Sequence, residues 1–159
     1  MIPSAAALER YLHERIPLSA NLGVRVSEAG LECVRLSAPL APNINHSGTV
    51  FGGSAAALAT LAAWGLLHVR LETAGIRART LIQRSQMEYE RPITGDFEAE
   101  CRLVDASAWE RFSVLLARRG RSRIPLGAQL RCAAHLVGRF EGEFVALAGA
   151  HVPPDPGGP

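Results

Sequence analysis

Apolar and polar positions alternate along much of this chain, but one stretch in its first half breaks the pattern. From Phe51 to Val69 the sequence contains no Asp, Glu, Lys or Arg, and Ala and Leu predominate. Ser54 is a favourable N-cap residue and Gly75 a favourable stop, so the pattern predicts one helix from about Ser54 to Glu72. Because its apolar residues occur on every side, this helix must be enclosed by protein or by lipid.

A membrane span is the first alternative, since about 18 or more uncharged residues suffice to cross a bilayer. Most of the stretch consists of Ala, Gly, Ser and Thr, which contribute little transfer free energy, and His68 and Arg70 lie at its end. The flanking segments have the pattern of ordinary amphipathic strands. We therefore expect no membrane span, and a helix wrapped by a curved sheet instead.

The segments before this helix have recognisable periods. Residues 4–15 have apolar positions at helical spacing, which predicts a first helix that ends before Pro17. Two strands are expected over residues 24–27 and 33–39, where apolar and polar residues alternate, with a tight turn at residues 28–30.

The segments after the central helix predict strands at residues 79–91, 96–104, 124–136 and 139–147. Between the second and third of these, Ser107 and Glu110 fit a capping box and favour a helix over residues 108–118. A strand over residues 112–117 is the alternative.

One face of the strand predicted at residues 79–91 is expected to point inward, and it contains Leu81, Gln83, Ser85, Met87 and Tyr89. Gln83 and Ser85 would then lie among apolar side chains. Polar groups in such surroundings need hydrogen-bond partners or a function.

Strands on both sides of a single apolar helix indicate the α+β class, with an antiparallel sheet curled around the helix. One sheet covers only one side of the helix and leaves its edge strands open, so pairing with a second copy is expected. Residues 1–150 are expected to form this single domain, and the Pro- and Gly-rich residues 151–159 a flexible tail.

Composition narrows the classes of function. The chain has 159 residues, of which 48% are hydrophobic and 20% charged, as in a soluble globular domain. Its formal charge of +2 gives no support for nucleic-acid binding. Three widely spaced cysteines and the absence of a secretory signal predict a reducing cytoplasm. The patterns of serine hydrolases, P-loops, dinucleotide sites and metal sites are absent.

The segment that opens the central helix carries a motif. Residues 48–54 read GTVFGGS and lead into LATL at residues 58–61, and residues 89–92 form a Tyr-x-x-Pro motif. Over about residues 17–147 the chain resembles the hotdog-fold thioesterases, most closely the family typified by the C-terminal domain of the bacterial YiiD protein. The resemblance implies a hotdog fold, a homodimer with one continuous sheet, and an acyl thioester of coenzyme A (CoA) or of acyl carrier protein (ACP) as substrate. CoA would enter only as part of the substrate, with no other cofactor, and pairing of dimers into tetramers is left open.

The glycine pair at the start of the helix is the expected centre of the chemistry. Gly52 and Gly53 let the backbone approach a ligand closely. Free N–H groups at about Gly53 to Ala55 would polarise the thioester carbonyl and stabilise the oxyanion formed by water attack, which places Gly53 and Ser54 in the candidate catalytic set. Phe51 and Gly52 are assigned to substrate binding. The alternative is that the glycines only let helix and sheet pack closely.

Asn45, His46 and Thr60 complete the candidate catalytic set. By the resemblance, Asn45 stands where phenylacetyl-CoA-type thioesterases carry an Asn near the attacking water, although Asn is also common in turns. His46 is a candidate general base, because imidazole is the side chain that most often fills this role, although a loop His is more often simply solvated. Thr60 stands where those relatives carry a catalytic Asp. Its hydroxyl can orient water but cannot take a proton at neutral pH, so the base comes from elsewhere or hydrolysis is weak or absent.

Two further groups are candidates for substrate binding. Gln83 and Ser85 are expected to complete the site across the dimer interface, or else to satisfy backbone groups where the sheet is distorted. Arg119 and Arg121, in the basic segment 118–123, are expected to hold the phosphates of CoA or an acidic carrier protein, or else to form a solvated turn.

Three functions fit these residues. The leading one is a cytoplasmic thioesterase in which water attacks the thioester directly, with no covalent intermediate. The second is a non-catalytic acyl-thioester or lipid-binding protein, because Thr60 replaces the acid. The third is a hotdog dehydratase, which would need a His and a carboxylate in the groove, and only His46 is a partial candidate.

Overall fold

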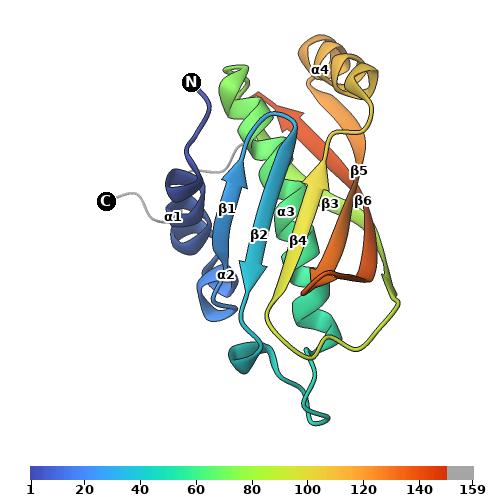
Figure 1. The fold of residues 1–159 in the computed structure, drawn as a ribbon. Coiled ribbons are helices and arrows are strands. Elements are labelled where there is room, and N and C mark those ends of the chain that lie inside the picture. The colour runs from blue at the N-terminus through green and yellow to red at the C-terminus, as the bar shows by residue number, and fades with distance from the viewer. Residues whose placement is uncertain (150–159) are drawn as a thin grey trace.

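A computed structural model of the chain describes residues 1–149 and shows an antiparallel sheet curled around one long helix (Figure 1). In chain order the elements are α1 (Ala5–Arg15), α2 (Pro17–Asn21), β1 (Arg25–Ala29), β2 (Cys33–Ala38), η1 (Ala41–Asn43), α3 (Gly52–Thr73), β3 (Ala78–Tyr89), β4 (Phe97–Arg102), α4 (Ala106–Arg119), β5 (Arg121–Cys132) and β6 (His135–Ala148). The six strands lie in the order β1-β2-β4-β5-β6-β3, so β1 and β3 form the two edges of the sheet. The predicted α+β class is confirmed, and the tail predicted at residues 151–159 lies outside the described residues.

Helix α3 is the centre of the core. It packs against β2, β4 and β5, and its buried residues occur around most of its circumference, as its uniform apolar pattern requires. By length and composition α3 could also cross a membrane, but 61% of its most apolar 18-residue window is buried inside the protein. This burial is that of a core helix.

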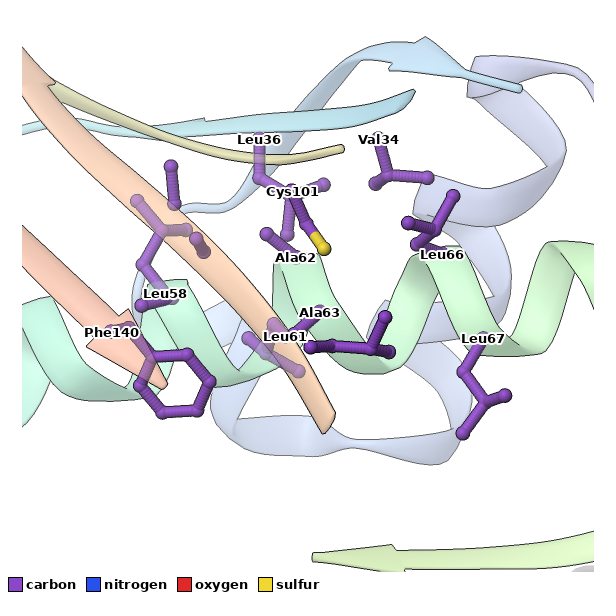
Figure 2. Close-up of a cluster of buried hydrophobic side chains, with 14 of the residues drawn as sticks. Val34, Leu36, Leu58, Leu61, Ala62, Ala63, Leu66, Leu67, Cys101 and Phe140 are labelled. Atoms are coloured by element: carbon purple, nitrogen blue, oxygen red, sulfur yellow. The ribbon is translucent and has the colours of Figure 1, made fainter. Parts of the chain in front are cut away.

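Along the strands, every second side chain points toward α3. Figure 2 shows Val34 and Leu36 of β2 and Cys101 of β4 facing Ala62 and Leu66 of α3, and all five belong to one cluster of buried hydrophobic residues. Full burial of an aliphatic side chain contributes about 1.5–3 kcal/mol relative to exposure. The period-2 pattern of these strands is therefore what fixes the sheet to the helix.

The first residue of α3 differs from the prediction. The helix begins at Gly52 with Phe51 as its N-cap residue and no side-chain cap, so the prediction that Ser54 is the N-cap is wrong. The reason is that the Phe51 carbonyl accepts the N–H groups of Ser54 and Ala55, at 2.9 and 3.2 Å. This carbonyl already closes the first turn, which places Ser54 inside the helix.

The starts of two other helices also differ from the sequence predictions. The side chain of Asp105 accepts the N–H of Ser107 at 2.9 Å, so Asp105 and not Ser107 is the N-cap of α4. The helix favoured over residues 108–118 is confirmed and the strand alternative is wrong. Pro17 does more than end α1, because it lies at the start of the short helix α2, where its fixed φ and missing N–H are tolerated.

Strand β3 contains a register shift between Ile82 and Arg84, which leaves Gln83 at an irregularity of the sheet. Ile82 lies opposite Phe144, and Ser85 lies opposite Gly142, on the face of β6 that packs on α3. Leu81 therefore points to the other face, and the prediction that one inward face contains both Leu81 and Ser85 is wrong. An extra residue reverses the alternation, and the sequence pattern does not reveal it.

The two edges of the sheet differ. At β1, the carboxylate of Glu9 on α1 accepts the N–H of Val26 at 2.8 Å and a hydrogen bond from Arg25, also at 2.8 Å. Strand β3, in contrast, is exposed along nearly its whole length. The chain covers one edge with its own helix and leaves the other edge accessible.

Helix α4 covers the end of the core at which α3 ends (Figure 1). The guanidinium of Arg70, near the last turn of α3, lies 4.6 Å from the ring centroid of Trp109 on α4 and donates to the carbonyl of Leu31. These contacts tie α4 and the β1–β2 turn to the C-terminal end of α3.

Candidate functional site

The first turn of α3 presents two backbone donors. Within residues 1–149, the N–H groups of Gly52 and Gly53 have no hydrogen-bond acceptor, whereas those of Ser54 and Ala55 are both bound to the Phe51 carbonyl. The donor pair is therefore Gly52–Gly53, and the expectation of free N–H groups at Ser54 and Ala55 is wrong. The positive end of the helix dipole adds to the attraction of these two donors for negative charge.

Two aromatic rings flank this glycine pair. A Cβ atom on Gly53 would lie only 2.3 Å from Cε1 of Phe51, and one on Gly52 would lie 3.4 Å from the ring of Tyr89. Both rings are more than half exposed, at 59% for Phe51 and 55% for Tyr89. Gly53 itself is exposed and Gly52 partly so, which leaves the donor pair accessible between two apolar walls. The missing side chain of Gly53 is thus required by the chain's own Phe51.

Asn45 shapes the hairpin that leads into α3. Its Oδ1 accepts the N–H groups of Ser47 and Thr49, at 2.8 and 3.1 Å, and its Nδ2 donates to Oγ1 of Thr49 at 2.9 Å. This is the geometry of an Asn that stabilises a turn. The predicted position of Asn45 near an attacking water stays a prediction, with one N–H of Nδ2 left to serve it.

His46 and Thr60 occupy different surroundings. His46 is exposed on the same hairpin, two residues before Gly48 at φ +77°. Thr60 lies seven residues after Gly53 on the same side of α3, about 10 Å along the axis at ~1.5 Å per residue. Its hydroxyl donates to the carbonyl of Ala56 at 2.8 Å, so its proton is already engaged. The roles of both residues as base or water ligand stay predictions.

Gln83 and Ser85 are exposed on β3 in the single chain, so they do not lie among apolar neighbours as expected. Gln83 marks the register shift, which matches the alternative of a sheet distortion. Ser85 lies on the face of the sheet that packs on α3. A second copy would be needed to enclose either side chain.

Arg119 and Arg121 lie at the opposite end of α3 from the donor pair. They flank Gly120, whose φ of +67° ends α4 before β5 begins. Helix α3 has 22 residues and is about 33 Å long at ~1.5 Å per residue. One chain therefore does not bring these arginines to Gly52 and Gly53.

Two open clefts of the protein also lie away from the donor pair. One, of about 750 Å³, lies between α4 and the face of the sheet that points away from α3, and Arg84, Arg123, Leu115, Gly127 and Glu141 are among its lining residues. The other, of about 300 Å³, adjoins it at Gly127 and Glu141. Neither contains a residue of the Asn45–Ser54 motif.

Groups with a displaced pKa do not gather at the donor pair either. Burial lowers the pKa of His68, whose ring lies against Tyr11 and Trp64 at centroid distances of 4.4 and 4.8 Å. Burial raises the pKa of Cys33 to about 11 and that of Cys101 to about 12, so both thiols stay protonated and unreactive. Within residues 1–149, no three His, Cys, Asp or Glu side chains are placed to hold a metal ion.

Comparison with known proteins decides the family. The family model described as "Putative thioesterase (yiiD_Cterm)" matches residues 5–148. The chain belongs to this family. Its fold is that of a Chlorobaculum tepidum protein of unknown function, at 26% identity and a TM-score of 0.87, over 91% of this chain and 94% of that one. A Pseudomonas aeruginosa protein described as a probable thioesterase matches at 26% identity and a TM-score of 0.79, over 93% of this chain and 99% of that one.

The hotdog fold of the yiiD_Cterm family also extends to more distant proteins. A thioesterase of Haemophilus influenzae shares 13% identity at a TM-score of 0.75, over 96% of each chain, and this likeness concerns the fold alone. The predicted family and hotdog architecture are confirmed, and the family match also includes α1, which lies outside the segment where the resemblance was noticed.

The sequence analysis missed one contact of the glycine pair. The hydroxyl of Tyr89 donates to the carbonyl of Gly52 at 2.9 Å, across 37 positions of sequence. The signal was present, since Tyr89 opens the Tyr-x-x-Pro motif. That motif identified the family but gave no contact.

Proposed function

We propose that this yiiD_Cterm-family protein hydrolyses an acyl thioester of CoA or ACP in the cytoplasm, with water as the nucleophile. The observation that carries the proposal is the unpaired N–H groups of Gly52 and Gly53 at the positive end of α3. The thioester carbonyl oxygen would accept both N–H groups. They would stabilise the negative charge that develops on this oxygen during the attack.

The reaction needs no covalent intermediate. The water oxygen forms a bond to the carbonyl carbon, the tetrahedral oxyanion rests on the two N–H groups, and the carbon–sulfur bond then breaks. The products are a carboxylate and a thiol: one proton of the attacking water ends on the thiol sulfur, and the other is released to solvent when the carboxylic acid ionises. The walls formed by Phe51 and Tyr89 would exclude bulk water around the oxyanion and so strengthen its hydrogen bonds.

The proposed active form is a homodimer, because the site in one chain is incomplete. Antiparallel pairing of β3 with its copy would place the Tyr89 end of one strand beside the Ala78 end of the other. Arg121 belongs to that second end, since it lies opposite Leu147, which lies opposite Arg79 on β3. A second copy would thereby bring Arg119 and Arg121 toward the donor pair, where they could bind the phosphates of CoA or an acidic carrier protein.

The same pairing bears on the missing base. The sequence has no Asp or Glu between Ala38 and Arg70, and the hydroxyl of Thr60 already donates within α3. Gln83 and Ser85 of a second copy would face the first from the middle of β3. Their side chains can orient a water molecule but do not take its proton at neutral pH. The two N–H donors would therefore supply most of the rate enhancement, and we expect a modest turnover.

A pair of substitutions at Gly52 tests the donor directly. Gly52→Pro removes the N–H, and the first position of a helix tolerates proline well. Phe51 already has φ −60° and ψ 131°, a conformation compatible with a following proline. We expect a loss of thiol release from acyl-CoA on the order of 10²-fold. Gly52→Ala is the matched control, because it adds a Cβ atom beside Tyr89 but keeps the N–H.

The assay is a screen of acyl-CoAs of graded chain length, with thiol release as the readout. Loss of activity in the proline variant and near-normal activity in the alanine variant would support the proposal. Equal activities in the two variants would contradict it, as would a wild type that releases no thiol from any substrate.

A second function, non-catalytic binding of an acyl thioester, is favoured by one observation. The hydroxyl of Thr60 is bound to Ala56 where a related thioesterase would carry an acid. In that case acyl-CoA would raise the melting temperature of the wild type, and no thiol would appear.

A further inference from the structure

Tyr89 has an unusual arrangement for an exposed tyrosine at the end of an edge strand. Its ring lies beside Gly52, and its hydroxyl donates to the Gly52 carbonyl at 2.9 Å. The ring is 55% exposed, so its hydroxyl could equally have been solvated. It instead contacts the carbonyl of the peptide unit whose N–H, that of Gly53, is free.

The Gly52–Gly53 peptide unit carries both the oxygen that Tyr89 contacts and the free N–H of Gly53. The carbonyl of Gly52 and the N–H of Gly53 belong to the same planar peptide bond, so orienting the oxygen also orients the hydrogen. A hydrogen bond accepted by the oxygen polarises the unit and makes its N–H a stronger donor, because bonds in a chain reinforce one another. The hydroxyl of Tyr89 can thus act on a ligand with which the hydroxyl itself makes no contact.

We propose that Tyr89 is a positioning residue for the oxyanion donor, fixing and polarising the Gly52–Gly53 peptide so that the Gly53 N–H points at the acyl oxygen of the thioester. This inference rests on the proposed hydrolysis and adds a residue to it. The hydroxyl keeps its own proton throughout, and no bond to substrate forms or breaks at Tyr89.

The surroundings hold both partners in place. Tyr89 pairs with Gly138 of β6, and the next two N–H groups, of Glu90 and Arg91, both bind the carbonyl of Val137 at 2.9 and 3.2 Å. On the other side of the glycine pair, the ring of Phe51 packs closely against Gly53. The donor peptide is therefore confined between two rings before any substrate arrives, which is the preorganisation that oxyanion stabilisation requires.

The substitution Tyr89→Phe removes the hydroxyl and keeps the ring. We expect kcat for acyl-CoA hydrolysis to fall about 2- to 10-fold, the effect of losing one hydrogen bond, with KM and melting temperature unchanged. Tyr11→Phe is the matched control. It removes the chain's other tyrosine hydroxyl, on α1, and should leave kcat unchanged.

A second measurement does not depend on turnover. In ¹H–¹⁵N spectra of the protein, Tyr89→Phe should move the amide proton of Gly53 to lower frequency, as expected for a weaker donor, and Tyr11→Phe should not. An unchanged Gly53 resonance, or an unchanged kcat in an active enzyme, would overturn the role of Tyr89.

The two proposals can fail separately. Activity that survives Gly52→Pro removes the proposed hydrolysis mechanism, whereas activity and a Gly53 resonance that both survive Tyr89→Phe remove only the positioning role. A fall in both kcat and melting temperature for Tyr89→Phe would identify a structural role and would also overturn the inference.

Discussion

The ring of Phe51 occupies the space that a Cβ atom on residue 53 would need. The ring atom Cε1 lies 2.3 Å from where a Cβ would be, closer than any real contact. Phe51 is nevertheless more than half exposed, so the ring can turn away into solvent. The glycine is therefore needed for the position of the ring, and much less for the stability of the fold.

The substitution Gly53→Ala separates these two needs. We expect the free energy of unfolding to stay within about 1 kcal/mol of wild type, because Ala favours the helix by about that amount and the displaced ring is exposed. Hydrolysis should fall, since the wall beside the donor pair has moved. Urea denaturation and thiol release measure the two effects.

Truncation of the ring provides the control for this experiment. In the double variant Phe51→Ala with Gly53→Ala, the collision no longer exists. If Gly53→Ala alone lost several kcal/mol and the double variant recovered them, the ring of Phe51 would be a fixed part of the fold, contrary to this expectation.

At the scale of elements, the two edge strands differ, because α1 covers β1 whereas β3 is exposed. Glu9 of α1 closes β1 through the N–H of Val26 and the guanidinium of Arg25. Burial raises the pKa of Glu9, but these hydrogen bonds outweigh it, and the pKa is lowered overall from its ordinary value of 4.5. The ionised carboxylate is thus the form that the folded protein prefers.

The lowered pKa of Glu9 predicts a pH dependence. Its contribution to stability is fully present above the unfolded pKa of about 4.5 and is lost as the pH falls through the lower folded value. At pH 7, Glu9→Gln should lower the free energy of unfolding by about 1 kcal/mol, and the difference from wild type should shrink below pH 4. Urea titrations at pH 7 and pH 3.5 provide the measurement. A constant difference at both values would contradict the assignment.

The sequence predicted the elements better than their details, for physical reasons. Helix α3 follows from an uninterrupted run of uncharged residues rich in Ala and Leu, and the strands follow from a period of 2. Both are local properties of the sequence. The register shift at Gln83 changes which face Leu81 occupies, and it arises from pairing with β6. The start of α3 depends on the Phe51 carbonyl, and a backbone acceptor leaves no trace in residue type.

The candidate site was predictable only in part. The motif located Gly52 and Gly53 because glycine types mark a special backbone. It did not show that Tyr89 contacts Gly52, since the two residues are 37 positions apart. Spacing also could not show that Arg119 and Arg121 lie at the far end of α3.

For the whole molecule, strand β3 is the accessible edge, and the proposed site needs a second copy on it. Ile82 is 40% exposed near the middle of this strand. A lysine there would place charge on the pairing surface, a device that proteins use to keep sheet edges apart.

We expect wild type to sediment at twice its 17.0 kDa chain mass and Ile82→Lys to sediment as a single chain with much reduced hydrolysis. Val104→Lys is the matched control. Val104 is 95% exposed and lies outside the sheet, so this variant should keep both the dimer and the activity. A wild type that sediments as one chain and still releases thiol would show that no second copy is required.

The covered edge at β1 has a consequence for how far such an assembly can grow. A pair joined through β3 would present β1 at both of its outer margins, each with the N–H of Val26 already occupied by Glu9. Strand addition would then stop at two molecules and could not continue into a filament. One glutamate on the first helix would thus make the oligomer self-limiting.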